Sequence, residues 1–215
     1  MSSEASSGEL SSVQRIDALD ARRVRWRNGL GWTKEIHVEF GAGEEAWIWR
    51  LSIAEIEQAA AFSKFECVER ELMLLTGNGL TLRFDDGQVS DLQPPHARLR
   101  FSGERALQGE PAGPGVSALN LMWRPDSVEV STLHRPLVGT MVVFVDPGDC
   151  WLVHVLAGHA RLVAGDTRVL ERGDTLVLRA PDRRCRYVLD GGGDVVLTRF
   201  QPVSLSPIRS PDLQV

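Results

Sequence analysis

Apolar residues at every second position mark most of this chain, in short runs separated by turn residues. The alternation is clear in four runs, at residues 36–40, 47–53, 80–84 and 97–101. It places one side of each strand on a core and the other side in water or in a pocket. The turns between runs are rich in Gly, Pro, Asp and Asn, as at Gly77-Asn78-Gly79, Asp85-Asp86-Gly87 and Pro147-Gly148-Asp149. Short strands with such turns predict an all-β sandwich or barrel.

Helical periodicity is sparse. Residues 53–60 fit one or two helical turns, but they equally fit the end of a strand and a loop. A weak internal repeat predicts two similar halves, because an apolar strand, a glycine turn and a second strand follow each other around both Gly77 and Gly158. Gly191-Gly192-Gly193 is interpreted as a hairpin turn. The predicted division is a disordered tail, two barrels and an irregular tail, with strands free to cross between the halves: 1–13, 14–125, 126–200 and 201–215.

Composition excludes several classes of protein. The net charge of −5 argues against a nucleic-acid partner, and the dense basic run at 22–27 is interpreted as a solvated segment. No run approaches 18 apolar residues, so no membrane-spanning helix is expected. The three cysteines form no CxxC pair, which disfavours a disulfide framework or a structural zinc site. The polar N-terminus lacks the features of a signal peptide, and we expect a cytoplasmic protein.

Two groups of motifs carry a family resemblance. The second half contains Leu170-Glu171-Arg172-Gly173-Asp174-Thr175-Leu176-Val177-Leu178, which resembles a cupin strand–turn–strand pattern. The first half contains Trp26-Arg27-Asn28-Gly29-Leu30-Gly31-Trp32-Thr33, Trp49-Arg50-Leu51-Ser52, Phe62-Ser63-Lys64-Phe65, Glu69-Arg70-Glu71-Leu72, Phe101-Ser102-Gly103-Glu104 and Leu119-Asn120-Leu121-Met122-Trp123-Arg124. In order, these motifs resemble the HutD/Ves family of bicupins over residues 14–200.

The resemblance implies a bacterial bicupin associated with histidine utilisation. It implies a regulatory or buffering role, with small acidic intermediates such as N-formylglutamate or formiminoglutamate as ligands, and it carries no assigned catalytic activity. This chain departs from the family pattern at three places. Leu30 stands where glycine is usual, Ala118 stands where an aspartate precedes the Leu-Asn pair, and Pro125 stands where a second arginine follows. These departures predict local changes in the pocket, since leucine adopts positive φ only at a cost.

Metal binding is the first question for a cupin-like chain. Metal cupins use an HxH pair with a downstream glutamate and a third histidine. The five histidines here form no HxH pair, and we expect neither a metal nor another cofactor. A remnant of such a site made by His154 and Cys185 is the alternative; a buried strand histidine and a buried thiol explain the same residues.

The polar positions of the first half offer a binding site instead. Arginine pairs bidentately with carboxylate, and asparagine and serine bind amide or formyl groups. If the polar strand faces line the barrel, they form a pocket. If the apolar faces are the ones that pack between the sheets, the polar faces point to solvent. In the pocket reading, Arg50 and Arg70 hold a carboxylate and Asn28, Ser52 and Asn120 hydrogen-bond the rest. The full predicted set of ligand-binding residues is Asn28, Thr33, Glu35, Arg50, Ser52, Arg70, Asn120 and Arg124.

Three functional hypotheses remain open at this level. The leading one is a non-enzymatic protein that binds a small acidic metabolite without metal. The second is a cupin isomerase or hydrolase, for which Glu35 or His37 is the weak candidate base because both are predicted on one strand face with Thr33. The third is a protein–protein regulator with a vestigial pocket. A homodimer is a default expectation. Trp47 and Trp49 are expected in a core, and for Trp26 and Trp32, which flank the Asn28-Gly29 turn, a core position and a place for one ring at the pocket mouth are the alternatives.

Overall fold

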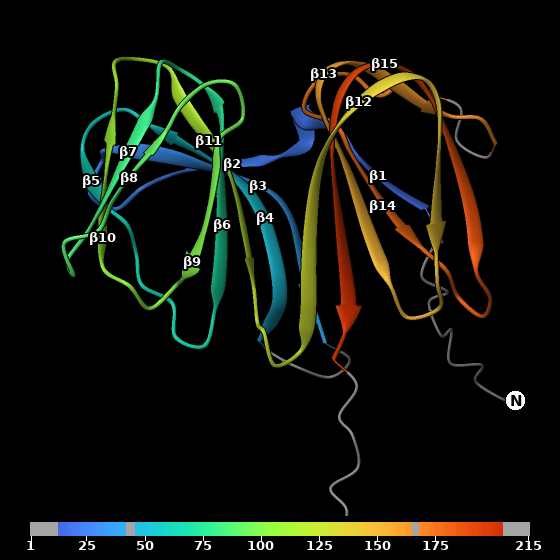
Figure 1. Ribbon diagram of the computed structural model, residues 1–215, viewed down its shortest axis with the longest axis horizontal. Helices are drawn as coiled ribbons and strands as arrows, with labels where there is room; N and C mark the ends of the chain where they lie inside the picture. The colour runs from blue at the N-terminus through green and yellow to red at the C-terminus, as the bar shows by residue number, and fades with distance from the viewer. Residues whose placement is uncertain (1–12, 42–45, 165–167, 204–215) are drawn as a thin grey trace, which may run out of the picture.

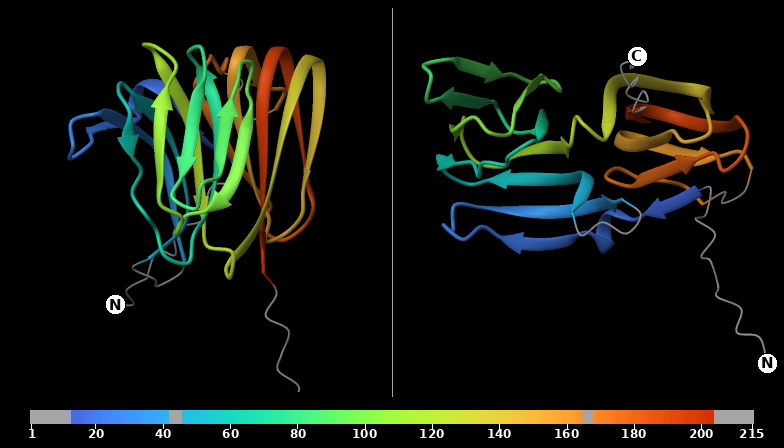
Figure 2. Two further views of the ribbon diagram at one scale, coloured as in Figure 1. Left: turned by 60° about the vertical axis from the view of Figure 1, so that its left-hand side comes forward. Right: turned by 90° about the horizontal axis from the view of Figure 1, so that it is seen from below.

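The chain folds into two β-barrel halves that lie side by side (Figures 1 and 2). The computed structural model describes residues 13–41, 46–164 and 168–203. Most of these residues belong to strands, in three antiparallel sheets. Within the described residues, no helix has the length and apolar character needed to cross a bilayer. The all-β bicupin predicted from the sequence is therefore confirmed.

The first half is built from two sheets. The larger has the strand order β2-β3-β4-β11-β6-β9, with bounds Arg22–Arg25, Gly31–Phe40, Trp47–Ile56, Val116–Trp123, Glu69–Thr76 and Arg98–Ser102. The smaller has the order β5-β10-β7-β8, with bounds Ala60–Ala61, Leu107–Pro111, Leu80–Phe84 and Val89–Leu92. The ambiguous segment 53–60 is a strand end, a loop and the short β5, so the helical alternative is wrong.

The second half is a single sheet that curves into a barrel. Its order is β1-β14-β13-β15-β12, with bounds Val13–Ile16, Thr175–Arg179, Cys150–Leu162, Cys185–Pro202 and Val128–Val145. Strands β12 and β15 each contain 18 residues and pair along their whole length. They bend over the top of the barrel in Figure 1, so each strand contributes to both of its walls.

Strand β1 crosses from the N-terminal end of the chain to the second half. It pairs with β14, beside which it lies in Figure 1. The Asp174 carboxylate fixes this crossing, because it accepts hydrogen bonds from the backbone N–H groups of Ala18 and Glu171 at 2.8 and 2.9 Å and pairs with the Arg15 guanidinium at 2.8 Å. The predicted division placed residues from 14 onward in the first barrel; residues 14–16 belong instead to the sheet of the second.

The outer face of the large sheet is packed against the second half. Trp49 and Leu51 project from β4 on this side, and the Trp49 ring stacks on Phe200 of β15 with centroids 4.2 Å apart. The inter-half core also includes Leu121 and Trp123 of β11 and Leu152 of β13. The apolar face of β4 is thus enclosed between the two halves, and its polar face lines the first barrel.

The second barrel is filled by apolar side chains. Buried aliphatic residues of β12, β13, β14 and β15 form one cluster in its interior: Leu137, Val143, Val145, Val153, Val155, Leu162, Leu176, Leu178, Leu189, Val195 and Leu197. The first barrel has a separate core cluster that includes Leu72, Leu82, Phe84 and Phe101. The two barrels share a fold but differ in how their interiors are occupied.

Glycines allow the long strands of the second half to bend. The sequence predicted a turn at Gly158 and a hairpin at Gly191-Gly192-Gly193, and both predictions are wrong, because β13 and β15 run unbroken through them. Gly158 has φ 73° and pairs with Gly193 where the register of the two strands shifts. A Cβ atom at Gly158 would lie 1.9 Å from the carbonyl oxygen of Gly192, so only glycine fits this crossing.

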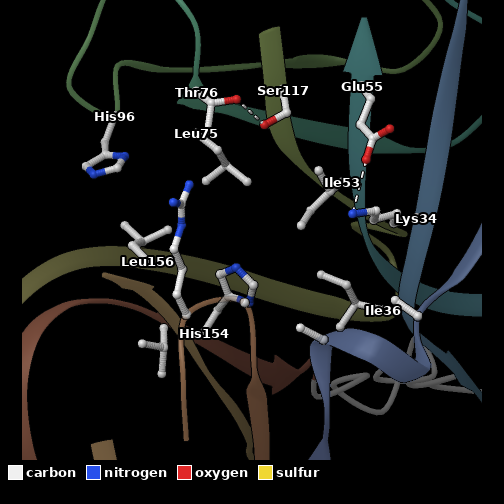
Figure 3. Close-up of a pocket in the computed structure, with 15 residues that line it drawn as sticks. Lys34, Ile36, Ile53, Glu55, Leu75, Thr76, His96, Ser117, His154 and Leu156 are labelled. Carbon is white, nitrogen blue, oxygen red and sulfur yellow. Dashed lines mark hydrogen bonds and ion pairs between the residues drawn. The ribbon is translucent and has the colours of Figure 1, made fainter. Parts of the chain in front are cut away.

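His154 lies in the contact between the halves, not in the second barrel. It is 3% exposed, and its Nδ1 lies 2.9 Å from the Thr175 hydroxyl. One side of the ring borders a hollow of about 250 Å³ between the halves (Figure 3). Cys185 packs instead against the core of the second barrel, on the other side of the sheet. The two residues therefore do not form the metal-site remnant weighed from the sequence.

Replacing Gly158 by alanine should destabilise the protein by roughly 2–5 kcal/mol, from backbone strain at positive φ together with the clash on Gly192. Gly139 is the matched control, since it has φ 72° but no atom within 4 Å of an added Cβ. Gly139→Ala should cost only about 1–2 kcal/mol. Urea unfolding of both variants measures the difference, and equal losses would contradict the predicted clash.

Stability should fall as the pH decreases from about 6.5 towards 4. Burial lowers the pKa of His154 from 6.5 to about 4, partly offset by the charge of Asp174. In this window the unfolded chain binds a proton that the folded chain does not, and the loss from this group amounts to roughly 3 kcal/mol. His154→Asn should remove one proton from the pH dependence of the unfolding free energy, measured by urea titration across this range. An unchanged slope would show that His154 does not cause it.

Candidate functional site

A cavity of about 580 Å³ opens into the first barrel. It is bordered by the polar face of the large sheet, by the segment 24–28 and by the loop around Phe62 and Phe65. Six of the eight residues predicted to bind a ligand line it, namely Asn28, Thr33, Arg50, Ser52, Arg70 and Asn120. Sequence positions far apart along the chain are therefore brought to one site.

Strand register explains how the central residues meet. β11 lies between β4 and β6, and Met122 is directly opposite Arg50 on one side and Arg70 on the other. Asn120 is opposite Ser52, and its amide nitrogen lies 3.3 Å from the Ser52 hydroxyl oxygen. Side chains opposite one another in a sheet share a face. Two guanidinium groups, an amide and a hydroxyl therefore line the same wall.

Arg70 is a buried cation that has no carboxylate partner in the described part of the chain. Arg70 is only 5% exposed. Its guanidinium donates hydrogen bonds to the Asn120 amide oxygen at 3.0 Å and to the Ser63 carbonyl oxygen at 3.3 Å. No acidic residue of the described chain forms an ion pair with it. Burial and the neighbouring charge of Arg50 lower the pKa of Arg70 to about 10, which leaves it charged at neutral pH. Phe62 and Phe101 each place a ring 5.3 Å from the guanidinium carbon.

Arg50 adds a second, partly paired cation. One terminal nitrogen of Arg50 lies 3.1 Å from the Glu35 carboxylate. Its Nε atom is buried and has no hydrogen-bond partner among the residues that the structure describes. An unsatisfied buried donor is costly unless something else satisfies it. The two arginines together with Glu35 leave an excess of positive charge at the cavity wall, which favours an anion.

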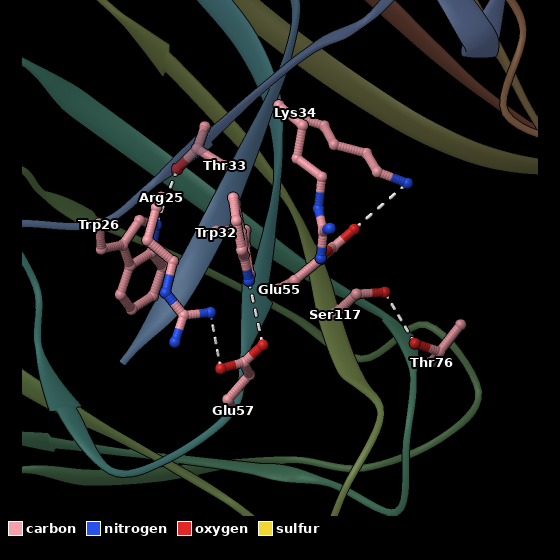
Figure 4. Close-up of polar contacts among 10 residues, drawn as sticks. Arg25, Trp26, Trp32, Thr33, Lys34, Glu55, Glu57, Thr76 and Ser117 are labelled. Carbon is pink, nitrogen blue, oxygen red and sulfur yellow. Dashed lines mark hydrogen bonds and ion pairs between the residues drawn. The ribbon is translucent and has the colours of Figure 1, made fainter. Parts of the chain in front are cut away.

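The hairpin between β2 and β3 forms the mouth of the cavity. The Trp26 indole N–H donates to the Thr33 hydroxyl at 2.9 Å (Figure 4), and the Trp26 ring meets the edge of Phe62 with centroids 5.9 Å apart. Trp32 lies outside the cavity, where its indole donates to Glu57 at 3.0 Å. Of the two tryptophans considered for the mouth, Trp26 is the one that borders it.

The departures from the family pattern have local explanations. At the turn, Gly29 takes the positive φ of 71°, and Leu30 needs no left-handed conformation. The Leu30 N–H is satisfied by the Asn28 side chain at 3.0 Å. Ala118 lies two residues before Asn120 on the same strand and is fully buried, so no carboxylate stands there to neutralise the arginines. Pro125 lies just beyond the end of β11.

The predicted face containing Thr33, Glu35 and His37 is broken by a β-bulge. Glu35 is opposite Ser52, but the register shifts and His37 is opposite Leu51. His37 consequently lies on the inter-half side, where it contacts Glu39 at 2.8 Å and packs against Trp49. A bulge inserts one extra residue and reverses the alternation beyond it. Glu35 and His37 therefore do not form a joint acid–base pair.

Arg124 also lies apart from the cavity lining. Its Nε donates to the carbonyl oxygen of Trp47 at 3.0 Å, and its guanidinium carbon lies 5.6 Å from the Trp47 ring. The strand β11 ends at Trp123, so the alternation that would direct Arg124 inward stops one residue before it.

Sequence periodicity missed several lining residues because they lie in loops or on an edge strand. Phe62, Phe65 and Arg27 border the cavity. The only sequence signal for the two phenylalanines was their place in the motif 62–65, which carried a resemblance but no stated role.

The wall of the cavity does not suit a metal ion. It presents guanidinium, amide, hydroxyl and thioether groups, of which the cations repel a metal. Across the described parts of the chain, no group of three or more His, Cys, Asp or Glu side chains could hold one.

Known proteins resemble this chain in sequence and in fold. A Pseudomonas putida protein described as an uncharacterized 21.2 kDa protein in the hutC 3' region is 37% identical over 116 residues, which is 54% of this chain and 60% of that protein. Protein Ves of Escherichia fergusonii is 35% identical over 88 residues, 40% of this chain and 44% of Ves. The matched regions thus span less than two thirds of either relative.

Solved structures resemble almost the whole chain. The structure of HutD from Pseudomonas fluorescens SBW25 superposes with a TM-score of 0.76 at 24% identity, over 88% of this chain and 98% of that one. The nickel complex of the bacterial pirin YhhW from Escherichia coli superposes with a TM-score of 0.65 at 9% identity, over 88% and 99% of the two chains. These likenesses show the shared fold. The family model described as HutD matches residues 18–197, and the chain belongs to the HutD family.

Proposed function

We propose that the first barrel binds a small acidic metabolite and that the protein acts without catalysing a reaction. The observation that carries this proposal is Arg70, a buried guanidinium that faces a cavity and lacks a carboxylate partner within the described chain. A buried charge is costly until it is paired. A bound carboxylate would supply the missing pair and would also satisfy the Arg50 Nε atom.

Family membership supports a metabolite of histidine breakdown as the ligand. The chain belongs to the HutD family, and the Pseudomonas putida relative is named for its place beside hutC. N-Formylglutamate combines two carboxylates with a formamide. In the proposed complex the arginines hold a carboxylate, while Ser52, Asn120 and Asn28 hydrogen-bond the formamide. Binding would let the protein buffer the intermediate or report its level to the pathway.

Catalysis is the weaker alternative. Glu35 is engaged by Arg50 and His37 lies on the other face of the sheet, so the acid–base pair considered from the sequence is not assembled. If the ligand is converted, the protein is an enzyme, and Glu35→Gln should abolish the conversion. A partner captured without any response to ligand would favour a protein–protein regulator.

Calorimetric titration with N-formylglutamate, formiminoglutamate, urocanate and histidine tests the proposal. We expect saturable binding of an acidic intermediate, recovered chemically intact after incubation. Histidine should bind at least tenfold more weakly, since its ammonium group would approach the two arginines. No binding across the panel would contradict the proposal.

Arg70→Met should remove binding without unfolding the protein. Methionine has similar length and no charge, and replacing a buried unpaired charge by an apolar side chain is neutral or stabilising. We expect an unchanged or higher melting temperature and at least a 30-fold loss of affinity, about 2 kcal/mol. Calorimetry and thermal unfolding of the same sample measure both effects.

Two arginines provide matched controls. Arg83 is exposed on β7 and pairs with Glu110 at 2.8 Å, and Arg124 contacts Trp47 outside the cavity lining. Arg83→Met and Arg124→Met should both leave the affinity within about twofold of the native value. A large loss of affinity in Arg124→Met would show that Arg124 contributes to ligand binding.

A further inference from the structure

The hollow between the two halves is separate from the cavity of the first barrel. The large sheet lies between them, because its outer face borders the hollow and its inner face borders the cavity. The hollow has a volume of about 250 Å³ and receives residues from both halves. Figure 3 shows Ile53 and Leu75 of the first half facing Leu156 and His154 of the second across it.

One ring nitrogen of His154, which borders this hollow, has no hydrogen-bond partner among the described residues. The Nδ1 of His154 is occupied by the Thr175 hydroxyl. Its Nε2 forms no hydrogen bond with any described residue, although His154 is 97% enclosed. A ring nitrogen in such surroundings is usually hydrogen-bonded. The hollow therefore has room for a ligand atom that bonds this nitrogen.

The remaining walls of the hollow consist of aliphatic side chains, which form a slot, and of the cation of Arg172 at the edge of this slot. Ile36, Ile53 and Leu156 provide apolar contact. Lys34 is engaged by Glu55 at 3.2 Å (Figure 4). Arg172 is exposed at the border of the hollow, and no carboxylate among residues 13–41, 46–164 and 168–203 pairs with it.

We propose that this hollow is a second binding site, for a small aromatic carboxylate that carries a hydroxyl group. The ring occupies the aliphatic slot, since a planar body fits between two packed sheet faces. The hydroxyl bonds the Nε2 atom of His154, and the carboxylate pairs with Arg172 at the edge. Such a ligand contacts both halves at once and stabilises their packing.

The probe is 4-hydroxybenzoate, followed by the NMR signals of the histidine side chains during titration. The His154 ring signals should shift and saturate at millimolar probe. Arg172→Gln should weaken the affinity at least tenfold, and Arg172 is exposed, so this variant should fold. 4-Hydroxybenzyl alcohol, which lacks the carboxylate, should bind at least tenfold more weakly than 4-hydroxybenzoate.

The site is distinguished from the barrel cavity by a second variant. Arg70→Met should leave the affinity for 4-hydroxybenzoate unchanged, whereas Ile53→Phe should abolish it by filling the slot. Absence of a saturable His154 shift in the native protein would overturn the proposal. Equal affinity of the native protein and Arg172→Gln for 4-hydroxybenzoate would also overturn the proposal. Loss of this affinity in Arg70→Met would overturn it as well.

Discussion

The rest of the structure depends on the large sheet of the first half, which packs against the second half on one face and lines a polar cavity on the other. The outer face of the large sheet is covered by the second half, with the stacked rings of Trp49 and Phe200 at the centre of the contact. Burial of these large apolar side chains is the main source of stability for such an arrangement. Because this face secures the fold, the inner face of the same strands is free to carry polar groups. Arg50 and Ser52 are neighbours of Trp49 and Leu51 along a single strand.

The two barrels differ in how their interiors are occupied, and the proposed binding role belongs to the first. The second barrel is filled by aliphatic side chains and offers its wall as a support. The first barrel keeps an open cavity with a buried guanidinium, an arrangement that reduces stability by itself. A binding site that is destabilising when empty is tolerated when another part of the fold contributes the missing stability. Here the inter-half core and the filled barrel have that role.

Local pattern was enough to predict the strands and the polar face of β4, because alternation depends only on neighbouring residues. It failed where an extra residue intervened. The bulge after Glu35 turns the His37 side chain to the opposite face of the sheet, and no residue of that segment predicts a bulge. The glycines of the long strands looked like turns because glycine permits both a turn and a sharp bend, and only the partner strand decides between them.

Site prediction was limited in the same way. Residues on central strands, such as Arg70 and Asn120, could be assigned from alternation and family motifs, since the register then brought them together. Trp26 and Phe62 reach the cavity from a hairpin and a loop, whose positions depend on distant contacts. Arg124 follows the motif in sequence but lies past the end of its strand, where the alternation no longer determines direction.

The crossing of β1 has a consequence for synthesis of the chain. Its residues leave the ribosome before those of every other described strand, whereas its pairing partner β14 emerges after all of them except β15. Contacts between residues so distant in sequence form late. The second barrel therefore cannot complete its sheet until β14 and β15 have been translated, whereas all the strands of the first barrel precede β12 in the chain. The first barrel can form while the second is still being made, and docking of β1 beside Asp174 then completes the sheet of the second half.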